Sequence, residues 1–122
     1  MAAAIEEAKA SIGQFFQAFY SSDPKYSHFT LKARFEESGK GEHIWLTDLD
    51  FTTTPATGVV GNEPRIKSLT YLERVPFTDE QISDWMYTEN EELVGAFTSR
   101  VLLRAQSKKR GLMGLLRRWF KM

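Results

Sequence analysis

The chain has 122 residues, 42% of them hydrophobic and 26% charged, and its 16 basic and 16 acidic side chains give a formal net charge of zero. This length predicts one domain, and the composition is that of an ordinary globular protein, not a disordered chain. The absence of cysteine excludes a disulfide framework, a thiolate metal site and a nucleophilic thiol. We find no apolar run near the ~18 residues that span a bilayer and no secretory signal, so we expect a cytoplasmic protein.

The first twenty residues have the spacing of an amphipathic helix. Apolar side chains recur there at steps of three and four residues, at Ile5, Ala8, Ile12, Phe15, Phe16 and Phe19. This stripe predicts a helix face that is buried against the rest of the domain. The sequence Ser22-Asp23-Pro24 ends the helix, because a residue before proline is pushed out of the helical region.

The middle of the chain has the pattern of a sheet. Residues 26–35 alternate between apolar and polar side chains, which predicts a strand. A glycine-containing turn at residues 38–41 joins it to a second strand at residues 43–47, as in an antiparallel hairpin. Two further strands are predicted, at residues 51–61 with an interruption at Pro55, and at residues 69–76 with Leu69, Tyr71, Glu73 and Val75 on one face.

Helical signals return in the last third of the chain. Thr78 and Gln81 have the spacing of a capping box, which predicts a short helix that buries Ile82, Trp85 and Met86. Residues 93–97 could form a closing strand, and Thr98 could cap a further helix. The order of elements predicts an α+β domain with an N-terminal helix, a curved antiparallel sheet of about four or five strands and C-terminal helices. A small SH3-like barrel is the alternative to an open sheet. We expect one domain at residues 1–104 and a tail at residues 105–122.

Several blocks of sequence resemble a known family. They are His43-Ile44-Trp45-Leu46-Thr47-Asp48, Gly61-Asn62-Glu63-Pro64, Ile82-Ser83-Asp84-Trp85-Met86-Tyr87 and the block from Leu93 to Leu102. Together they resemble the bacterial YegJ-like family, a domain of unknown function, over residues 26–103. The chain departs from the family at residues 71–74, where such domains often have a glycine-containing turn. The resemblance implies a small bacterial domain and brings no established activity with it.

Candidate catalytic and metal-binding residues are few. His28 and His43 could join Asp48 or Asp50 as metal ligands, but neither histidine has ligand spacing, so ordinary hydrogen-bonding roles are favoured. The two aspartates could also act as an acid–base pair, although Asp-Leu-Asp is equally a common start of a turn. The sequence has no phosphate-binding loop and no nucleophile elbow. It therefore predicts no catalytic residue, no metal ligand, no cofactor and no enzymatic activity.

Two tryptophans suggest a contact surface, because tryptophan buries a large apolar area and keeps an N–H that needs a partner. The predicted surface consists of Trp45, Asn62, Glu63, Pro64, Asp84 and Trp85. The alternative is that both indoles lie in the core, with Asp84 as a cap or as the acceptor of an N–H.

The zero net charge conceals two oppositely charged parts. Residues 1–103 carry 9 basic and 16 acidic side chains, a net charge of −7, whereas residues 104–122 carry 7 basic and no acidic side chains. The tail has the pattern of a basic amphipathic helix. Its candidate contact residues are Arg110, Leu112, Leu115, Leu116, Arg117, Arg118, Trp119, Phe120 and Lys121.

Such a helix could pack on the acidic body, dock on a partner or lie on an anionic membrane surface. Nucleic-acid binding is disfavoured, because the acidic body repels phosphate.

The leading hypothesis is a non-enzymatic protein-interaction module whose partner is another protein. An immunity-like, toxin-neutralising role fits by analogy of size and charge alone. The first alternative is a peripheral membrane protein anchored by its amphipathic C-terminal helix. The second is a cryptic enzyme or a metal-binding protein.

Overall fold

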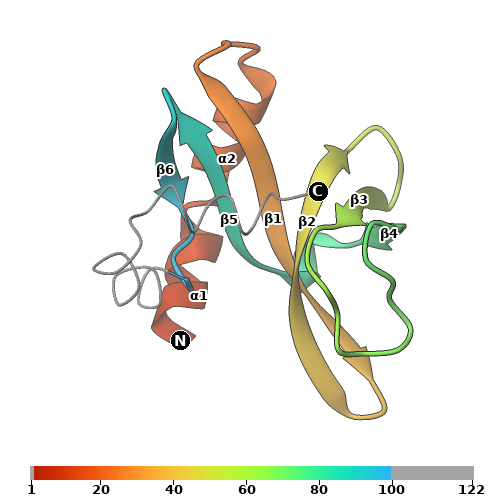
Figure 1. Ribbon diagram of the computed structural model, residues 1–122. Coiled ribbons are helices and arrows are strands. Elements are labelled where there is room, and N and C mark those ends of the chain that lie inside the picture. The colour runs from red at the N-terminus through yellow and green to blue at the C-terminus, as the bar shows by residue number, and fades with distance from the viewer. Residues whose placement is uncertain (1, 100–122) are drawn as a thin grey trace, which may run out of the picture.

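The computed structural model describes residues 2–99 (Figure 1). Two helices, α1 (Ala2–Ala10) and α2 (Ile12–Tyr20), precede the sheet. Within these residues the strands are β1 (Tyr26–Glu37), β2 (Lys40–Asp50), β3 (Ala56–Val60), β4 (Arg74–Phe77), β5 (Ile82–Glu89) and β6 (Glu92–Gly95), with a short 3-10 helix, η1 (Asp79–Gln81), before β5. The predicted α+β class and the N-terminal helical segment are confirmed.

The described strands form one sheet in the order β4-β3-β2-β1-β5-β6, and all neighbours are antiparallel. Strands β4 and β6 lie at opposite edges and do not pair with each other, so the sheet is open. The alternative of an SH3-like barrel is therefore wrong, because a barrel requires its first and last strands to pair. The sheet also has more strands than the four or five predicted.

The hairpin of β1 and β2 follows the sequence prediction closely. Glu37 pairs with Lys40 and Leu31 pairs with Leu46, so the two strands are in register across the turn. Ser38 and Gly39 both have positive φ, at 52° and 79°. This is the backbone of the two-residue turns that match the right-handed twist of a hairpin.

Three other segments differ from the prediction. Residues 51–55 join β2 to β3, and the third strand begins only at Ala56. Residues 69–73 form a turn, in which Leu72 has a φ of 74°, and the strand begins only at Arg74. The capping box of Thr78 and Gln81 is present, but its helix ends after η1. Residues 82–89 then pair with β1 as a strand, so the predicted helix at this point is wrong. Pairing with a neighbouring strand has overridden the local helix signal. The C-terminal helices and the boundary at residue 104 lie outside the described residues.

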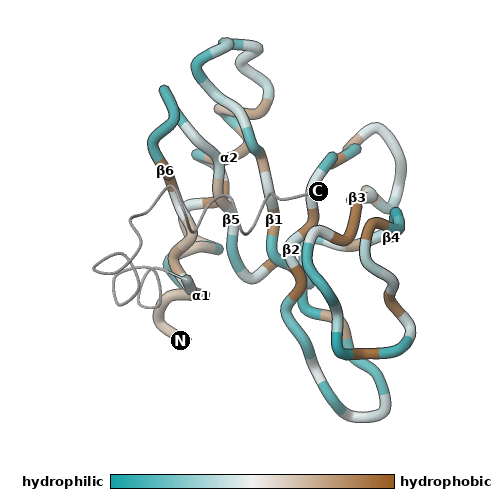
Figure 2. The backbone as a smooth tube through the Cα atoms, in the orientation of Figure 1, coloured by the Kyte–Doolittle hydropathy of each residue, from teal (hydrophilic) through white to brown (hydrophobic). Residues whose placement is uncertain are grey.

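The main core lies between the helices and one face of the sheet, as the apolar stripe predicted. Phe15 of α2 is fully buried, with its ring centroid 6.1 Å from that of Trp85 and 6.4 Å from that of Tyr87. The indole Nε1 of Trp85 donates a hydrogen bond of 3.0 Å to the carbonyl of Ala8. This bond ties α1 to β5. By contrast, the tip of the β1–β2 hairpin is largely hydrophilic and extends away from this core (Figure 2).

Candidate binding groove

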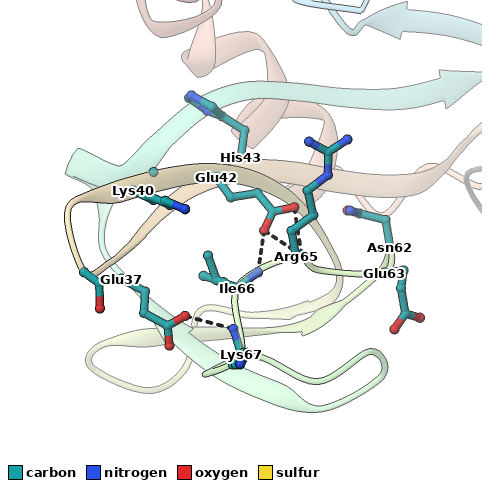
Figure 3. A pocket seen from close by; sticks show the side chains of 11 residues that line it. Glu37, Lys40, Glu42, His43, Asn62, Glu63, Arg65, Ile66 and Lys67 are labelled. Carbon is teal, nitrogen blue, oxygen red and sulfur yellow. Dashed lines mark hydrogen bonds between the residues drawn. The ribbon is translucent and has the colours of Figure 1, made fainter.

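An open groove lies between the tip of the β1–β2 hairpin and the loop that joins β3 to β4 (Figure 3). Its volume is about 1220 Å³. The residues that line it are Glu37, Ser38, Lys40, Gly41, Glu42, His43, Asn62, Glu63, Arg65, Ile66 and Lys67. The groove is therefore built from two segments that are separate in sequence, and most of its lining residues are charged or polar.

Two carboxylates of the hairpin hold the loop in place. The Glu42 carboxylate accepts the backbone N–H groups of Arg65, at 2.8 Å, and of Ile66, at 3.0 Å. Glu37 accepts the next backbone N–H, that of Lys67, at 2.9 Å. Hydrogen bonds to ionised acceptors are among the stronger ones in proteins. Three successive amides of the loop are thus fixed against the hairpin.

A fourth contact fixes the start of the loop. The side-chain Oδ1 of Asn62 accepts the backbone N–H of Trp45 at 2.8 Å. Gly61 also donates its N–H to the carbonyl of Trp45, at 2.8 Å. The groove is consequently a preformed feature of the fold, with both of its walls hydrogen-bonded to each other.

The exposed side chains of the groove include three cations, Lys40, Arg65 and Lys67. The ion pairs between described residues are Arg34–Glu36 and Arg74–Asp48, so these three cations have no ion-pair partner in that part of the chain. The lining also contains three carboxylates, those of Glu37, Glu42 and Glu63, so the formal charges of these six side chains sum to zero. Two of those carboxylates, however, already accept backbone N–H groups, whereas the three cations have no ion-pair partner among residues 2–99.

His43 lies in the wall of the groove and contributes no positive charge near neutral pH. Its Nδ1 is 2.8 Å from the hydroxyl of Ser83. Burial, followed by the nearby charges of Lys32 and Arg34, lowers the pKa of His43 below its ordinary value of 6.5. The imidazole is therefore neutral at pH 7.

The role of Glu42 gives a first testable prediction. Glu42→Gln removes the negative charge that holds the amides of Arg65 and Ile66, and we expect a loss of about 1–2 kcal/mol in the free energy of unfolding. Hydrogen exchange at these two amides should accelerate by at least tenfold. The matched control is Glu36→Gln, on the same hairpin, whose exposed ion pair should contribute at most about 1 kcal/mol. Unchanged exchange at both amides would contradict the role of Glu42.

A second polar cluster lies on the face of the sheet away from the helices. Asp84 is fully buried, and its carboxylate accepts the N–H groups of Trp85 at 2.8 Å, Phe97 at 3.1 Å and Thr98 at 2.8 Å. The hydroxyl of Thr98 also donates to Asp84, at 2.6 Å, and accepts a hydrogen bond from Lys32 Nζ, at 2.8 Å. This cluster holds the turn after β6 against the sheet.

Lys32 is the cation of this cluster. Its Nζ lies 4.7 Å from the ring centroid of Trp45, within the range of a cation–π contact. Burial lowers the pKa of Lys32, and the Asp84 carboxylate acts in the opposite direction. Because these polar atoms bond to other parts of the protein, we assign the cluster a structural role.

The tryptophans and the aspartate of the predicted contact surface are buried. The exposed fractions are 1% for Trp85, 3% for Trp45 and 0% for Asp84. Trp85 packs with the helices, whereas Trp45 lies on the opposite face, between Ile44 and Leu46 in the sequence. The observed arrangement is that of the alternative hypothesis, in which both indoles are buried and Asp84 accepts an N–H group.

The remaining residues of that surface lie in the loop. Asn62 and Glu63 line the groove, and Pro64 lies between lining residues. This part of the predicted surface therefore lies at the groove, whereas the two indoles do not line it. Lys40, Glu42 and the cations of the loop were not predicted as site residues; for the two hairpin residues, the charged side chains beside the glycine turn were the available signal.

Of the histidines and aspartates considered as ligands, His28 and Asp48 line the same open pocket, whereas His43 lies at the hairpin groove, and their polar atoms have other partners. His28 Nδ1 is 3.1 Å from the hydroxyl of Thr88, and Asp48 pairs with Arg74. Asp50 accepts the N–H of Thr52 at 2.8 Å, in a turn. Residues 2–99 contain no group of three or more His, Asp or Glu side chains arranged to hold a metal ion.

The structure also bears on membrane association. None of the helices between residues 2 and 99 has the length and apolarity needed to cross a bilayer. The candidate residues of the basic tail, Arg110 to Lys121, lie outside the described residues.

Comparison with known proteins identifies the family. Residues 1–111 match a bacterial family described as "Uncharacterized protein conserved in bacteria (DUF2314)", and the chain belongs to this family. A curated relative, "Uncharacterized protein YegJ" of Escherichia coli (strain K12), is 32% identical over 110 residues, which cover 89% of this chain and 71% of the relative. No solved structure matches the chain. The YegJ-like resemblance is confirmed and extends to the N-terminal helices, and neither description states an activity.

Proposed function

We propose that this protein is a non-enzymatic binding module that holds an extended, acidic segment of another protein in the groove between the hairpin and the loop. The observation that supports this function is the set of exposed cations, Lys40, Arg65 and Lys67, which have no ion-pair partner among residues 2–99 and surround a loop that is already fixed. Carboxylates of a partner would match these donors in charge and in hydrogen bonding, and these short-range contacts would have to outweigh the repulsion from the net charge of −7 on residues 1–103.

The shape of the groove favours a peptide over a small molecule. Sites for small molecules are usually clefts of about 300–1,000 Å³ with mainly apolar walls. This groove is open, has a volume of about 1220 Å³ and is lined mostly by charged and polar residues. An extended chain could lie between hairpin and loop with its side chains reaching both. Because Glu37 and Glu42 already fix the loop, binding would cost little additional ordering of the protein.

The groove also lacks the arrangement that nucleophilic catalysis needs. His43 is the base nearest to a hydroxyl, but its partner Ser83 is only 4% exposed. A nucleophile must reach the bound molecule, and Ser83 is shielded from the groove's contents. Nucleophilic catalysis by Ser83 is therefore not part of the proposed function.

The experiment compares peptides that differ only in charge. An eight-residue peptide of alternating Glu and Ala should bind at least tenfold more tightly than the matching Gln peptide, as measured by isothermal titration calorimetry at low salt. The triple variant Lys40→Gln/Arg65→Gln/Lys67→Gln should lose at least tenfold in affinity for the acidic peptide. Raising the salt concentration should weaken binding, because the contacts are exposed to solvent.

The matched control removes three exposed cations elsewhere, as Lys9→Gln/Lys25→Gln/Arg74→Gln. It has the same net charge as the groove variant and should bind the acidic peptide nearly as well as the parent chain. Equal losses in the two triple variants would mean attraction by net charge alone and would contradict the proposal. Tighter binding of a single-stranded oligonucleotide than of the acidic peptide would also contradict it.

The other hypotheses receive no support from a specific contact. An immunity-like role rests on size and charge, and the membrane-anchor alternative depends on residues 104–122, outside the described residues. We therefore propose an interaction module that binds another protein, and we do not assign an immunity-like or membrane-anchoring role.

A further inference from the structure

A second groove, smaller and more apolar, lies between the helices and the start of β5. Its volume is about 340 Å³, and its lining residues are Lys9, Ile12, Phe16, Asp79, Glu80 and Ile82. The apolar side chains, which we call the floor of the groove, are Ile12 and Phe16 of α2 and Ile82 of β5. The two carboxylates come from η1 and are exposed at the rim.

We propose that this groove binds the C-terminal segment of the same chain, residues 111–122. The sequence of this segment combines leucines and an aromatic pair, Trp119-Phe120, with the cations Arg117, Arg118 and Lys121. Apolar side chains of the segment would cover the floor of the groove, and its cations would meet the acidic rim. This inference is independent of the binding function proposed for the hairpin groove.

Charge complementarity favours this occupant. Asp79 and Glu80 have no ion-pair partner between residues 2 and 99, and Lys9 is the one cation in the lining. The excess of acidic groups on residues 1–103 is equal in size to the basic charge of residues 104–122, at 7 charges each. A basic segment at this rim would therefore be attracted both locally and by the body as a whole.

The chain is long enough to reach the groove. Ser99, the last described residue, lies beside Lys32, with 3.5 Å between Ser99 Oγ and Lys32 Nζ. The pairing of β5 with β6 runs only from Met86↔Gly95 to Glu89↔Glu92, so among residues 2–99 the first half of β5 has no strand on its outer side. The chain could pass from one face of the sheet to the other around this edge. Residues 100–110 can extend over roughly 36 Å, which exceeds the ~30 Å diameter of a small domain.

Docking at this groove would prevent the apolar face of the C-terminal segment from binding elsewhere. The apolar face of the segment would be covered by Ile12, Phe16 and Ile82, and so would be withheld from membranes and from other proteins.

Paramagnetic relaxation enhancement on the full chain tests the proposal. The absence of cysteine allows a single nitroxide label to be attached at Met122→Cys without removing any native thiol. We expect at least a twofold loss of amide signal intensity at residues 9–16 and 79–82, with no loss at residues 62–67. Charge reversal of the rim, Asp79→Lys/Glu80→Lys, should restore most of the lost intensity. Circular dichroism verifies that this variant is folded.

The same approach distinguishes two other arrangements: binding of the segment from a second copy of the chain, and binding of the segment to a membrane. A mixture of labelled, isotopically unenriched chain with unlabelled, ¹⁵N-enriched chain shows whether the contact is made by a second copy. Losses of equal size in that mixture would overturn the proposal, as would losses elsewhere on the domain. Absence of any loss in solution, combined with co-sedimentation of the full chain on phosphatidylglycerol vesicles, would identify a membrane anchor and would also overturn it.

Discussion

Replacing Asp84 with alanine should lower the free energy of unfolding by about 3–5 kcal/mol, because it leaves several buried hydrogen-bond donors without their acceptor. The variant loses the acceptor for the N–H groups of Trp85, Phe97 and Thr98 and for the hydroxyl of Thr98. It also leaves the Lys32 ammonium buried without the compensating negative charge, which should lower the pKa of Lys32 further. Urea denaturation monitored by circular dichroism measures the loss.

Two further variants show how much of the stability loss of Asp84→Ala comes from the buried hydrogen bonds. Asp84→Asn retains one acceptor oxygen and should lose less stability than Asp84→Ala. Glu6→Ala removes an exposed carboxylate from α1 and should change stability by no more than about 0.5 kcal/mol. Similar values for Asp84→Ala and Glu6→Ala would show that the buried cluster does not stabilise the turn after β6.

Trp85→Ala should cost about 3–5 kcal/mol, because it leaves a large cavity in the main core. The indole packs against Phe15, Tyr87 and Phe97, with ring centroids between 5.4 and 6.1 Å away. The variant also loses the hydrogen bond to Ala8, so the amides of α1 should lose protection against hydrogen exchange. Urea denaturation gives the free energy, and exchange measured by NMR gives the local effect.

Trp85→Phe separates the hydrogen bond from the packing. It keeps an aromatic ring in the core and should cost less than Trp85→Ala, while still reducing the protection of α1. Tyr20→Ala is the control for a large aromatic side chain on α2, since Tyr20 is 63% exposed. An equal loss of stability for Tyr20→Ala and Trp85→Ala would contradict the assignment of Trp85 to the core.

The sequence predicted the parts of the fold that depend on local patterns. Alternation along β1 and the turn at Ser38 and Gly39 are sufficient to define the hairpin, because strand period and turn geometry are properties of short segments. The strand at the start of β5 was not predicted, because it depends on a distant segment and not on a local pattern. Thr78 and Gln81 do form their capping box, but pairing of residues 82–89 with β1, far away in sequence, decides the structure that follows.

The candidate site was less predictable, since its contacts join distant residues. Glu42 holds the amides of Arg65 and Ile66, which lie 23 and 24 positions later, and no local motif marks such a pair. The tryptophans show a second limit. An indole suits a core as well as an interface, and only the packing of β5 against α1 and α2 decides that Trp85 is buried.

The binding of an acidic segment in the hairpin groove is tested most directly by a ¹H–¹⁵N NMR titration of the full chain with the alternating Glu–Ala peptide. We predict saturable shifts of the amide signals of residues 40–43 and 62–67, which line or adjoin the groove, and smaller shifts elsewhere in the sheet. The same titration with the Gln peptide should leave these signals in place. Shifts that are absent, or that centre on a surface remote from Lys40, Arg65 and Lys67, would contradict the proposed function.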